Sequence, residues 1–278
     1  MIVFPNAKIN IGLNIVERRP DGYHNIETVF YPIPLCDALE IVPAHDGDAT
    51  LTCYGNAVDC PVEKNLVMKA YRLMQRQFQL PPVNIFLYKH IPDGAGLGGG
   101  SSDAAFTLTT LNTIFRLNLT NEQLAQMAIT IGADCPFFIY NTPMMATGIG
   151  DVLSPIDVDI KRFTLLLIKP DVSVPTKAAY AQVTPHPALV PIPAIIEQGP
   201  QLWRDTLVND FETSVFAQYP ELASIKQSLY DAGAIYASMS GSGSSIFGLF
   251  PASTSTEQLK QMSLLNHYPT HFILPLSH

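Results

Sequence analysis

The chain has 278 residues, of which 47% are hydrophobic and 14% are charged, and its formal net charge is −8 at pH 7. This composition supplies enough apolar residues to bury the core of one large or two medium domains, and it excludes an intrinsically disordered chain. Because the balance is acidic and the sequence has no cluster of Lys and Arg, we expect no nucleic-acid partner.

The cysteines at positions 36, 53, 60 and 135 are scattered, and no C-x-x-C pair occurs. We therefore expect reduced thiols and no zinc site. The first residues lack a basic segment followed by an apolar run, and no apolar stretch reaches the length of a membrane span. These features predict a cytoplasmic protein without a membrane partner, and they leave the oligomeric state open.

Near the N-terminus, apolar residues at positions 9, 11, 13 and 15 alternate with Lys8, Asn10, Gly12 and Asn14. This period of two predicts a strand with one buried face and one polar face. The polar face is either solvated or part of a site. A turn signal follows at 20–22, and then come Tyr23, His24 and a second strand-like run at 26–33.

Two further strands are predicted at 39–42 and 49–54. Residues 65–78 predict a helix, because apolar residues at 66, 67, 70, 73 and 74 fall on one side. An apolar run at 83–88 predicts another strand. Directly after it, five of the seven residues from Gly94 to Gly100 are glycine, and an apolar stripe at positions 104, 108, 111 and 115 then indicates a helix.

The order strand, glycine loop and helix is typical of a phosphate-binding loop. Glycines let backbone N–H groups approach an anion, and the first N–H groups of a helix are free to bind it. We expect the helix to open with Ser101, Ser102 and Asp103. A P-loop is excluded because no lysine follows the glycines, whereas Gly94-x-Gly96-x-x-Gly99 is a weak match to a dinucleotide fingerprint. A flexible linker is the remaining alternative.

Residues 120–123 predict a capping box that opens a helix ending near Gly132. Asp134 then stands between this helix end and an apolar run, a costly place for an unpaired carboxylate. It is either a cap or turn residue or part of a site.

Residues 151–160 are predicted to be a connector, broken at Pro155 and close to a domain boundary. The second half begins with a strand at 163–168, and it continues with a proline-rich loop at 185–200 and a helix at 221–232. A second Gly/Ser loop at 238–245 lies between strand-like runs. A short helix at 257–265 and a strand at 272–276 complete the chain.

Several of these segments together resemble the GHMP kinases. The glycine loop is similar to their signature P-x-x-x-G-L-G-S/G-S-S, residues 5–11 to their opening P-A-K-[IL]-N-[IL] with Asn6 as a minor departure, and Ser238–Ser245 to their third motif, M-[ST]-G-[ST]-G-[ST]. The longer form G-A-G-L-G-G-G-S-S-D-A-A, the triplet G-Y-H at 22–24, G-A-D-C-P-F-F at 132–138 and N-D-F-E at 209–212 resemble one branch of the family. That branch phosphorylates a cytidyl diphosphate sugar alcohol in the non-mevalonate isoprenoid pathway.

The resemblance implies an α+β, two-domain GHMP kinase fold. It implies an N-terminal ATP-binding domain over residues 1–154, similar to ribosomal protein S5 domain 2, and a ferredoxin-like C-terminal domain over residues 155–278. It also implies ATP and Mg²⁺ as cofactors, with the metal ligands unknown and Ser102 the best candidate in the loop to face the metal.

The resemblance assigns catalysis to Lys8 and Asp134, with the aspartate as the base that accepts the proton of the substrate hydroxyl. It assigns ATP to Pro92, Asp93, Gly94, Ala95, Gly96, Leu97, Gly98, Gly99, Gly100, Ser101 and Ser102. It assigns the alcohol substrate to Asn10, Tyr23, His24, Thr176 and Tyr180. Tyr23 and Tyr180 would stack on cytosine and His24 would bind its edge, although Tyr180 could equally pack in a helix groove.

Three alternatives remain. A kinase of the same superfamily for another small alcohol, such as homoserine or mevalonate, is disfavoured by G-Y-H. A dinucleotide-dependent oxidoreductase should carry an acidic residue about 20 positions after the loop, and residues 111–119 contain none. A non-catalytic binding module is expected to have lost Lys8 or Asp134, and both are present.

Overall fold

The structure is a computed structural model of the chain, and it describes residues 1–44, 46–57 and 60–276. Its strands are β1 (Ile2–Val3), β2 (Asn6–Arg18), β3 (His24–Cys36), β4 (Ala38–Pro43), β5 (Thr50–Gly55), β6 (Val83–Lys89), β7 (Met144–Thr147), β8 (Val152–Pro155), β9 (Phe163–Ile168), β10 (Tyr236–Met239), β11 (Ile246–Pro251) and β12 (His271–Pro275). Its helices are α1 (Leu66–Phe78), α2 (Gly99–Ile114), α3 (Asn121–Ile129), α4 (Cys135–Tyr140), α5 (Thr176–Ala181), α6 (Ile192–Ile196), α7 (Phe211–Gln218), α8 (Pro220–Asp231) and α9 (Thr256–Lys260), with short 3₁₀ helices at Val62–Lys64, Pro200–Leu202 and Ser263–Asn266.

This mixture of helices and strands confirms the expected α+β class. Within the described residues, none of the helices has the length and apolar character that crossing a membrane needs.

The chain divides into two compact units, each assembled from separate segments. Unit 1 comprises Met1–Lys8, Leu35–Asp93 and Gly98–Thr142, and unit 2 comprises Ile9–Pro34, Gly94–Leu97 and Pro143–His278. Strands β2 and β3 and the glycine loop therefore contribute residues to both units. The boundary between residues 154 and 155 stays a prediction, since these units reflect packing alone.

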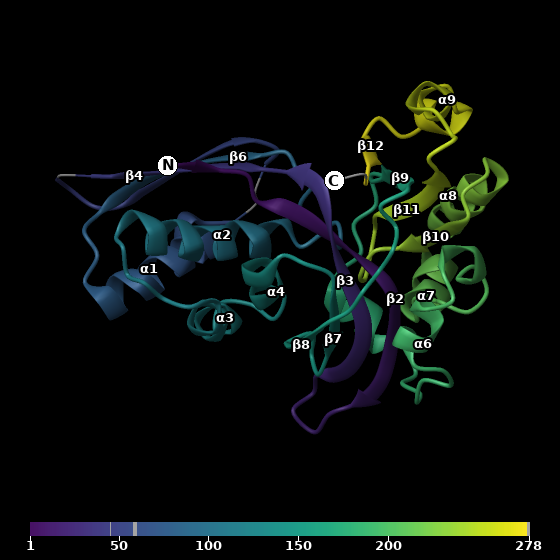
Figure 1. Cartoon of the computed structure of the whole chain (residues 1–278), viewed down its shortest axis with the longest axis horizontal. Helices are drawn as coiled ribbons and strands as arrows, with labels where there is room; N and C mark the ends of the chain where they lie inside the picture. Colours follow the sequence, from purple (N-terminus) through teal and green to yellow (C-terminus); the bar gives the residue numbers. More distant parts are fainter. Residues whose placement is uncertain (45, 58–59, 277–278) are drawn as a thin grey trace. The chain divides into compact units, whose positions relative to one another are not determined.

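Unit 1 is built on a sheet of order β1-β4-β6-β5, along which α1 and α2 pack against each other (Figure 1). β4 pairs with β6 antiparallel, and β5 pairs with β6 parallel. The alternation in β6 places Val83, Ile85 and Leu87 on the buried face. The next residue on that face is Lys89, which carries a charge into the interior and is only 4% exposed.

The helices of unit 1 begin where the sequence supplies caps. Asn65 accepts a hydrogen bond from Val67 N (2.9 Å) at the start of α1, and the predicted capping box of Thr120 and Gln123 is present at α3. Helix α2 starts at Gly99, two residues before the expected Ser101. Glycine occupies its first two positions, and the low helix propensity of glycine gives no signal in the sequence for a helix there.

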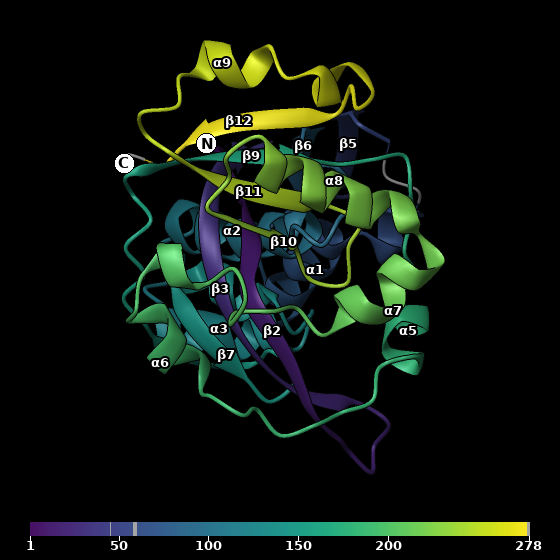
Figure 2. The ribbon, with the colours of Figure 1, turned by 90° about the vertical axis from the view of Figure 1, so that its right-hand side faces the viewer.

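Unit 2 contains a four-stranded antiparallel sheet of order β10-β11-β9-β12, against which α8 packs (Figure 2). Its core includes Leu166, Ile168, Ile225, Leu229 and Phe250. A second sheet has the order β2-β3-β7-β8 and carries residues of both units in its first two strands.

Three local expectations were wrong. The connector at 151–160 contains strand β8, because pairing with β7 overrides Pro155 at its end. The loop at 185–200 contains α6, where Pro193 occupies the first turn and its missing N–H costs nothing. The helix at 257–265 is divided into α9 and a 3₁₀ helix at Ser263–Asn266.

Candidate active site

A buried lysine faces a partly exposed carboxylate in unit 1. Lys8 lies in β2 and Asp134 lies just before α4, and Nζ of the lysine is 3.5 Å from Oδ2 of the aspartate. The lysine side chain is 4% exposed and the aspartate side chain is 33% exposed. Burial lowers the pKa of Lys8 below its ordinary 10.5, and the attraction of Asp134 opposes this only in part. An anion brought to this place would therefore stabilise the ammonium form.

Asp134 occupies the N-cap position of α4, but its side chain makes no capping hydrogen bond. Pro136 stands in the first turn of that helix. The local geometry does not use the carboxylate as a helix cap, although Asp134 does lie in a turn. The carboxylate is directed at Lys8 and keeps a third of its side-chain surface accessible.

On the polar face of β2, Lys8 and Asn10 are buried and not solvated, whereas Asn14 is partly exposed. Asn10 is 2% exposed; its Nδ2 donates to Thr28 Oγ1 (3.0 Å), and its backbone N donates to Ser240 Oγ (3.3 Å). Thr28 Oγ1 in turn donates to Gly12 O (2.5 Å). Asn10 is thus fixed by strand β3 and by the second Gly/Ser loop, within unit 2.

The glycine loop uses backbone conformations that favour glycine. Gly94, Gly96 and Gly98 have φ of 59°, 75° and 70°. Gly98 is also the N-cap of the 16-residue helix α2. A Cβ on Gly98 would lie 2.9 Å from Phe138 and 3.2 Å from Cε of Lys8. The helix N-terminus therefore lies directly beside the lysine, in unit 1.

The other loop residues differ in exposure. Ala95 and Leu97 are buried and anchor the loop, Asp93 is exposed, and Pro92, Gly100 and Ser101 are partly exposed. Ser102 is fully buried, and within the described part of the chain its Oγ has no hydrogen-bond partner. No cluster of three or more His, Cys, Asp or Glu side chains that could hold a metal ion occurs among the residues that the structure describes.

The residues expected to bind a base lie in unit 2. The rings of His24 and Tyr180 stack with centroids 5.0 Å apart, and Tyr180 also meets Phe211 edge-on at 4.8 Å. Tyr23 is 61% exposed, and Thr176 Oγ1 lies 3.1 Å from Ser242 Oγ. Burial lowers the pKa of His24 below 6.5, and the positive charge of Arg18 lowers it further, so the ring is neutral at pH 7.

Sequence reasoning missed a buried cluster of ionised groups beside the loop. Nζ of Lys89 donates to Asp103 Oδ2 (2.7 Å) and to Asp37, and the other oxygen of Asp37 accepts from His90 N (2.6 Å) and Ile91 N (2.8 Å). The alternation of β6 was a usable signal for Lys89, but no local pattern marks Asp37.

Two family models match the chain: "GHMP kinases N terminal domain" over residues 65–142 and "GHMP kinases C terminal" over residues 192–264. The chain is 56% identical over 252 residues to a 4-diphosphocytidyl-2-C-methyl-D-erythritol kinase of Bacteroides fragilis, covering 90% of this chain and 92% of that protein. It is 52% identical to the kinase of the same name from Parabacteroides distasonis, over 96% of each chain.

A crystal structure of 4-(cytidine 5'-diphospho)-2C-methyl-D-erythritol kinase matches with a TM-score of 0.84 and 32% identity, covering 99% of this chain and 98% of that one. The two-domain fold expected from the motifs is therefore confirmed. The chain belongs to the GHMP kinases, in the branch of the 4-diphosphocytidyl-2-C-methyl-D-erythritol kinases.

Proposed function

We propose that this chain transfers the γ-phosphoryl group of ATP to the 2-hydroxyl of 4-diphosphocytidyl-2-C-methyl-D-erythritol, giving the 2-phosphate and ADP in the non-mevalonate route to isopentenyl diphosphate. Its membership of the family supports this reaction. The observation that carries the proposal is the Lys8–Asp134 pair, because Gly98 at the start of α2 lies beside that same lysine. A base, a cation and a helix N-terminus thus meet within one unit.

Phosphorylation of an alcohol requires alignment, a proton acceptor and stabilisation of charge on the transferred group. In this proposal Asp134 accepts the proton of the 2-hydroxyl as the oxygen attacks the γ-phosphorus. Lys8, whose Nζ lies 3.5 Å from the carboxylate, stabilises the negative charge of the phosphoryl oxygens. The partial exposure of Asp134 supports this role, since a hydroxyl must reach the base.

ATP would be held by residues 92–102, where backbone N–H groups at the start of α2 face the phosphates. The buried Oγ of Ser102, which has no hydrogen-bond partner among the described residues, could donate to a phosphate oxygen or bind Mg²⁺. Because Mg²⁺ usually keeps several waters and binds through substrate phosphates, the small donor set fits a metal that arrives with ATP and neutralises phosphate charge. Ser102 is the residue we propose to face it.

The alcohol substrate would be held by Asn10, Tyr23, His24, Thr176 and Tyr180. The lowered pKa of His24 supports its part, because a neutral imidazole offers one donor and one acceptor to the edge of a pyrimidine. Tyr180 already stacks on that ring, which leaves its stacking on cytosine a prediction. A cytoplasmic location also stays a prediction.

The test is a coupled assay of ADP release with ATP and a panel of alcohols: the cytidyl substrate, homoserine and mevalonate. We expect turnover of the cytidyl substrate alone. His24→Ala should raise its KM about tenfold or more, because a lost contact leaves buried polar groups unpaired at about 1–3 kcal/mol, and the KM for ATP should stay nearly unchanged. His267→Ala, at an exposed histidine, is the matched control.

Turnover of another alcohol in place of the cytidyl substrate would contradict the proposed reaction. An effect of His24→Ala on ATP alone would instead show that the cytosine site is misplaced.

A further inference from the structure

Residues 209–212 include the start of α7, and they contact strand β2 within unit 2. Asn209 forms a parallel bridge with Leu13, whose N donates to Val208 O and whose O accepts from Asp210 N, both at 2.8 Å. Asp210 Oδ2 also accepts from Ile15 N (2.7 Å). The segment is therefore fixed on strand β2, and the side chains that it carries have defined positions.

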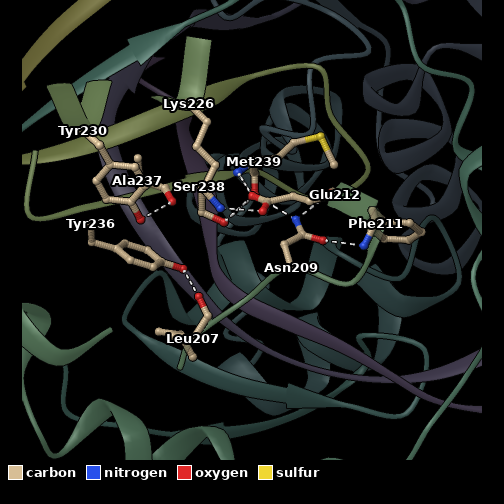
Figure 3. A network of polar contacts seen from close by, with 11 residues as sticks. Leu207, Asn209, Phe211, Glu212, Lys226, Tyr230, Tyr236, Ala237, Ser238 and Met239 are labelled. Atoms are coloured by element: carbon tan, nitrogen blue, oxygen red, sulfur yellow. Dashed lines mark hydrogen bonds and ion pairs between the residues drawn. The ribbon is translucent and has the colours of Figure 1, made fainter. Parts of the chain in front are cut away.

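The amide of Asn209 holds two carbonyls of the second Gly/Ser loop. Its Nδ2 donates to Met239 O (2.8 Å) and Gly241 O (2.9 Å), and its Oδ1 accepts from Phe211 N (3.0 Å), as Figure 3 shows for Met239 and Phe211. The residue is 2% exposed, so these bonds are protected from water. The two carbonyls flank Ser240, which fixes the backbone on both sides of that serine.

Glu212 holds the same loop from its amide side. Its Oε1 accepts from Met239 N (2.8 Å) and Ser238 Oγ (3.1 Å), and its Oε2 accepts from Lys226 Nζ (2.5 Å) (Figure 3). Lys226 balances the charge of this mostly buried carboxylate. Both backbone polar groups of Met239 are thus bound by residues 209–212.

Ser240 in turn contacts the first glycine loop. Its Oγ donates to Gly96 O (2.8 Å) and accepts from Asn10 N (3.3 Å). Ser245 N donates to Ala95 O (3.3 Å). A Cβ on Gly96 would overlap the carbonyl oxygen of Ser240, so the two backbones touch. The carbonyls of Ala95 and Gly96 are therefore fixed just before the loop reaches Leu97 and Gly98.

We propose that Asn209 and Glu212 are positioning residues for nucleotide binding: they hold Ser240, and Ser240 holds the glycine loop at Gly96. This inference rests on the proposed function of that loop. Asn209 contributes more than Glu212, because its two donated hydrogen bonds lie on both sides of the serine. Loss of either link allows the loop to leave the conformation that receives phosphates, and it leaves the chemistry at Asp134 untouched.

The test compares Asn209→Asp and Ser240→Ala with Tyr236→Phe. Asn209→Asp keeps the acceptor for Phe211 N but loses both donated bonds, and Ser240→Ala breaks the next link. Tyr236→Phe removes a buried hydrogen bond of similar length, Oη to Leu207 O at 3.0 Å, whose acceptor lies outside both loops (Figure 3). ADP affinity is measured by titration calorimetry, stability by urea unfolding, and KM and kcat by the coupled assay.

Because each variant removes buried hydrogen bonds that hold the loop, we expect Asn209→Asp and Ser240→Ala to weaken ADP binding about fivefold or more. For Asn209→Asp the KM for ATP should rise similarly, and the KM for the alcohol and kcat should change less than about twofold. Tyr236→Phe should lose comparable stability and bind ADP like the wild type.

The proposal would be overturned if both test variants bound ADP within about twofold of the wild-type affinity, or if Tyr236→Phe lost as much ADP affinity as they do. Wild-type protein that binds no ADP would refute the proposed function itself, and the positioning role with it.

Discussion

Two lysines are buried in unit 1, and their pKa values move in opposite directions. Nζ of Lys89 lies against Asp37 and Asp103, whose side chains are at most 3% exposed. Nζ of Lys8 lies 3.5 Å from Asp134, whose side chain is 33% exposed. Burial lowers the pKa of both lysines. At Lys8 burial prevails, whereas at Lys89 the two carboxylates outweigh it and raise the pKa.

The difference separates a structural ion cluster from a group available to a substrate. The charge of Lys89 is fully compensated inside the protein, so a phosphate has little to add to it. At Lys8 burial outweighs the attraction of Asp134, and the arrival of a phosphoryl group would stabilise the ammonium form. We infer that the Lys89 cluster holds the residue before β4, strand β6 and helix α2 together, and that Lys8 serves the transfer reaction.

Asp134→Asn should show the largest effect. The amide keeps the shape of the side chain but accepts a proton poorly, so kcat should fall by about 10²–10⁴-fold, the usual contribution of a general base. The free energy of unfolding should change by less than about 1 kcal/mol, because the carboxylate is partly solvated. Steady-state kinetics and urea unfolding of the same preparation measure both quantities. Full activity of this variant would remove Asp134 from the chemistry.

Asp37→Ala tests the other cluster. It removes one carboxylate from Lys89 and leaves His90 N and Ile91 N without their acceptor. Breaking a buried pair in this way costs about 3–5 kcal/mol of stability. Urea unfolding should show this loss, and kcat of the protein that remains folded should lie near the wild-type value. Wild-type stability would mean that the cluster does not hold the unit together.

A smaller effect should appear in the pH dependence of stability. Burial, and secondarily the charge of Asp37, raises the pKa of Asp103 from 3.8 to about 7, against the opposing attraction of Lys89. Between these values the folded chain binds more protons at this site than the unfolded chain does. Its contribution to stability is therefore complete below about pH 4 and is lost as the pH rises to about 7.

Asp103→Asn should remove that dependence. Urea unfolding from about pH 5 to 8 should show the wild type losing stability, relative to the variant, as the pH rises toward 7. A constant difference between the two proteins across this range would show that Asp103 does not titrate in the folded state.

Elements with a clear period were predictable from the sequence. The apolar alternation of β2 and β6 and the stripe of α2 depend on local patterns, and the structure contains each of these elements. Helix α6 was missed because its prolines suggest a loop, although a proline is harmless in a first turn. Strand β8 was missed because pairing with β7 decides its conformation.

The site was harder to predict, because its contacts join distant parts of the chain. Lys8 and Asp134 were connected only through the resemblance, and local reasoning left the aspartate as a possible cap. Asp37 had no local signal. Asn209 stood in a recognised segment, yet its link to Ser240 becomes visible only when β10 and β2 are placed in space.

The most direct test of the two roles exchanges each lysine for methionine, which keeps the length of the apolar stem and removes the charge. We predict that Lys8→Met lowers kcat about 10²-fold or more and changes the free energy of unfolding by less than about 1 kcal/mol. We predict that Lys89→Met lowers the free energy of unfolding by about 3–5 kcal/mol, because it leaves two buried carboxylates uncompensated. The measurement is the pair of values, kcat and unfolding free energy, for both variants. Equal destabilisation by the two exchanges, or wild-type turnover in Lys8→Met, would contradict the division of roles between the lysines.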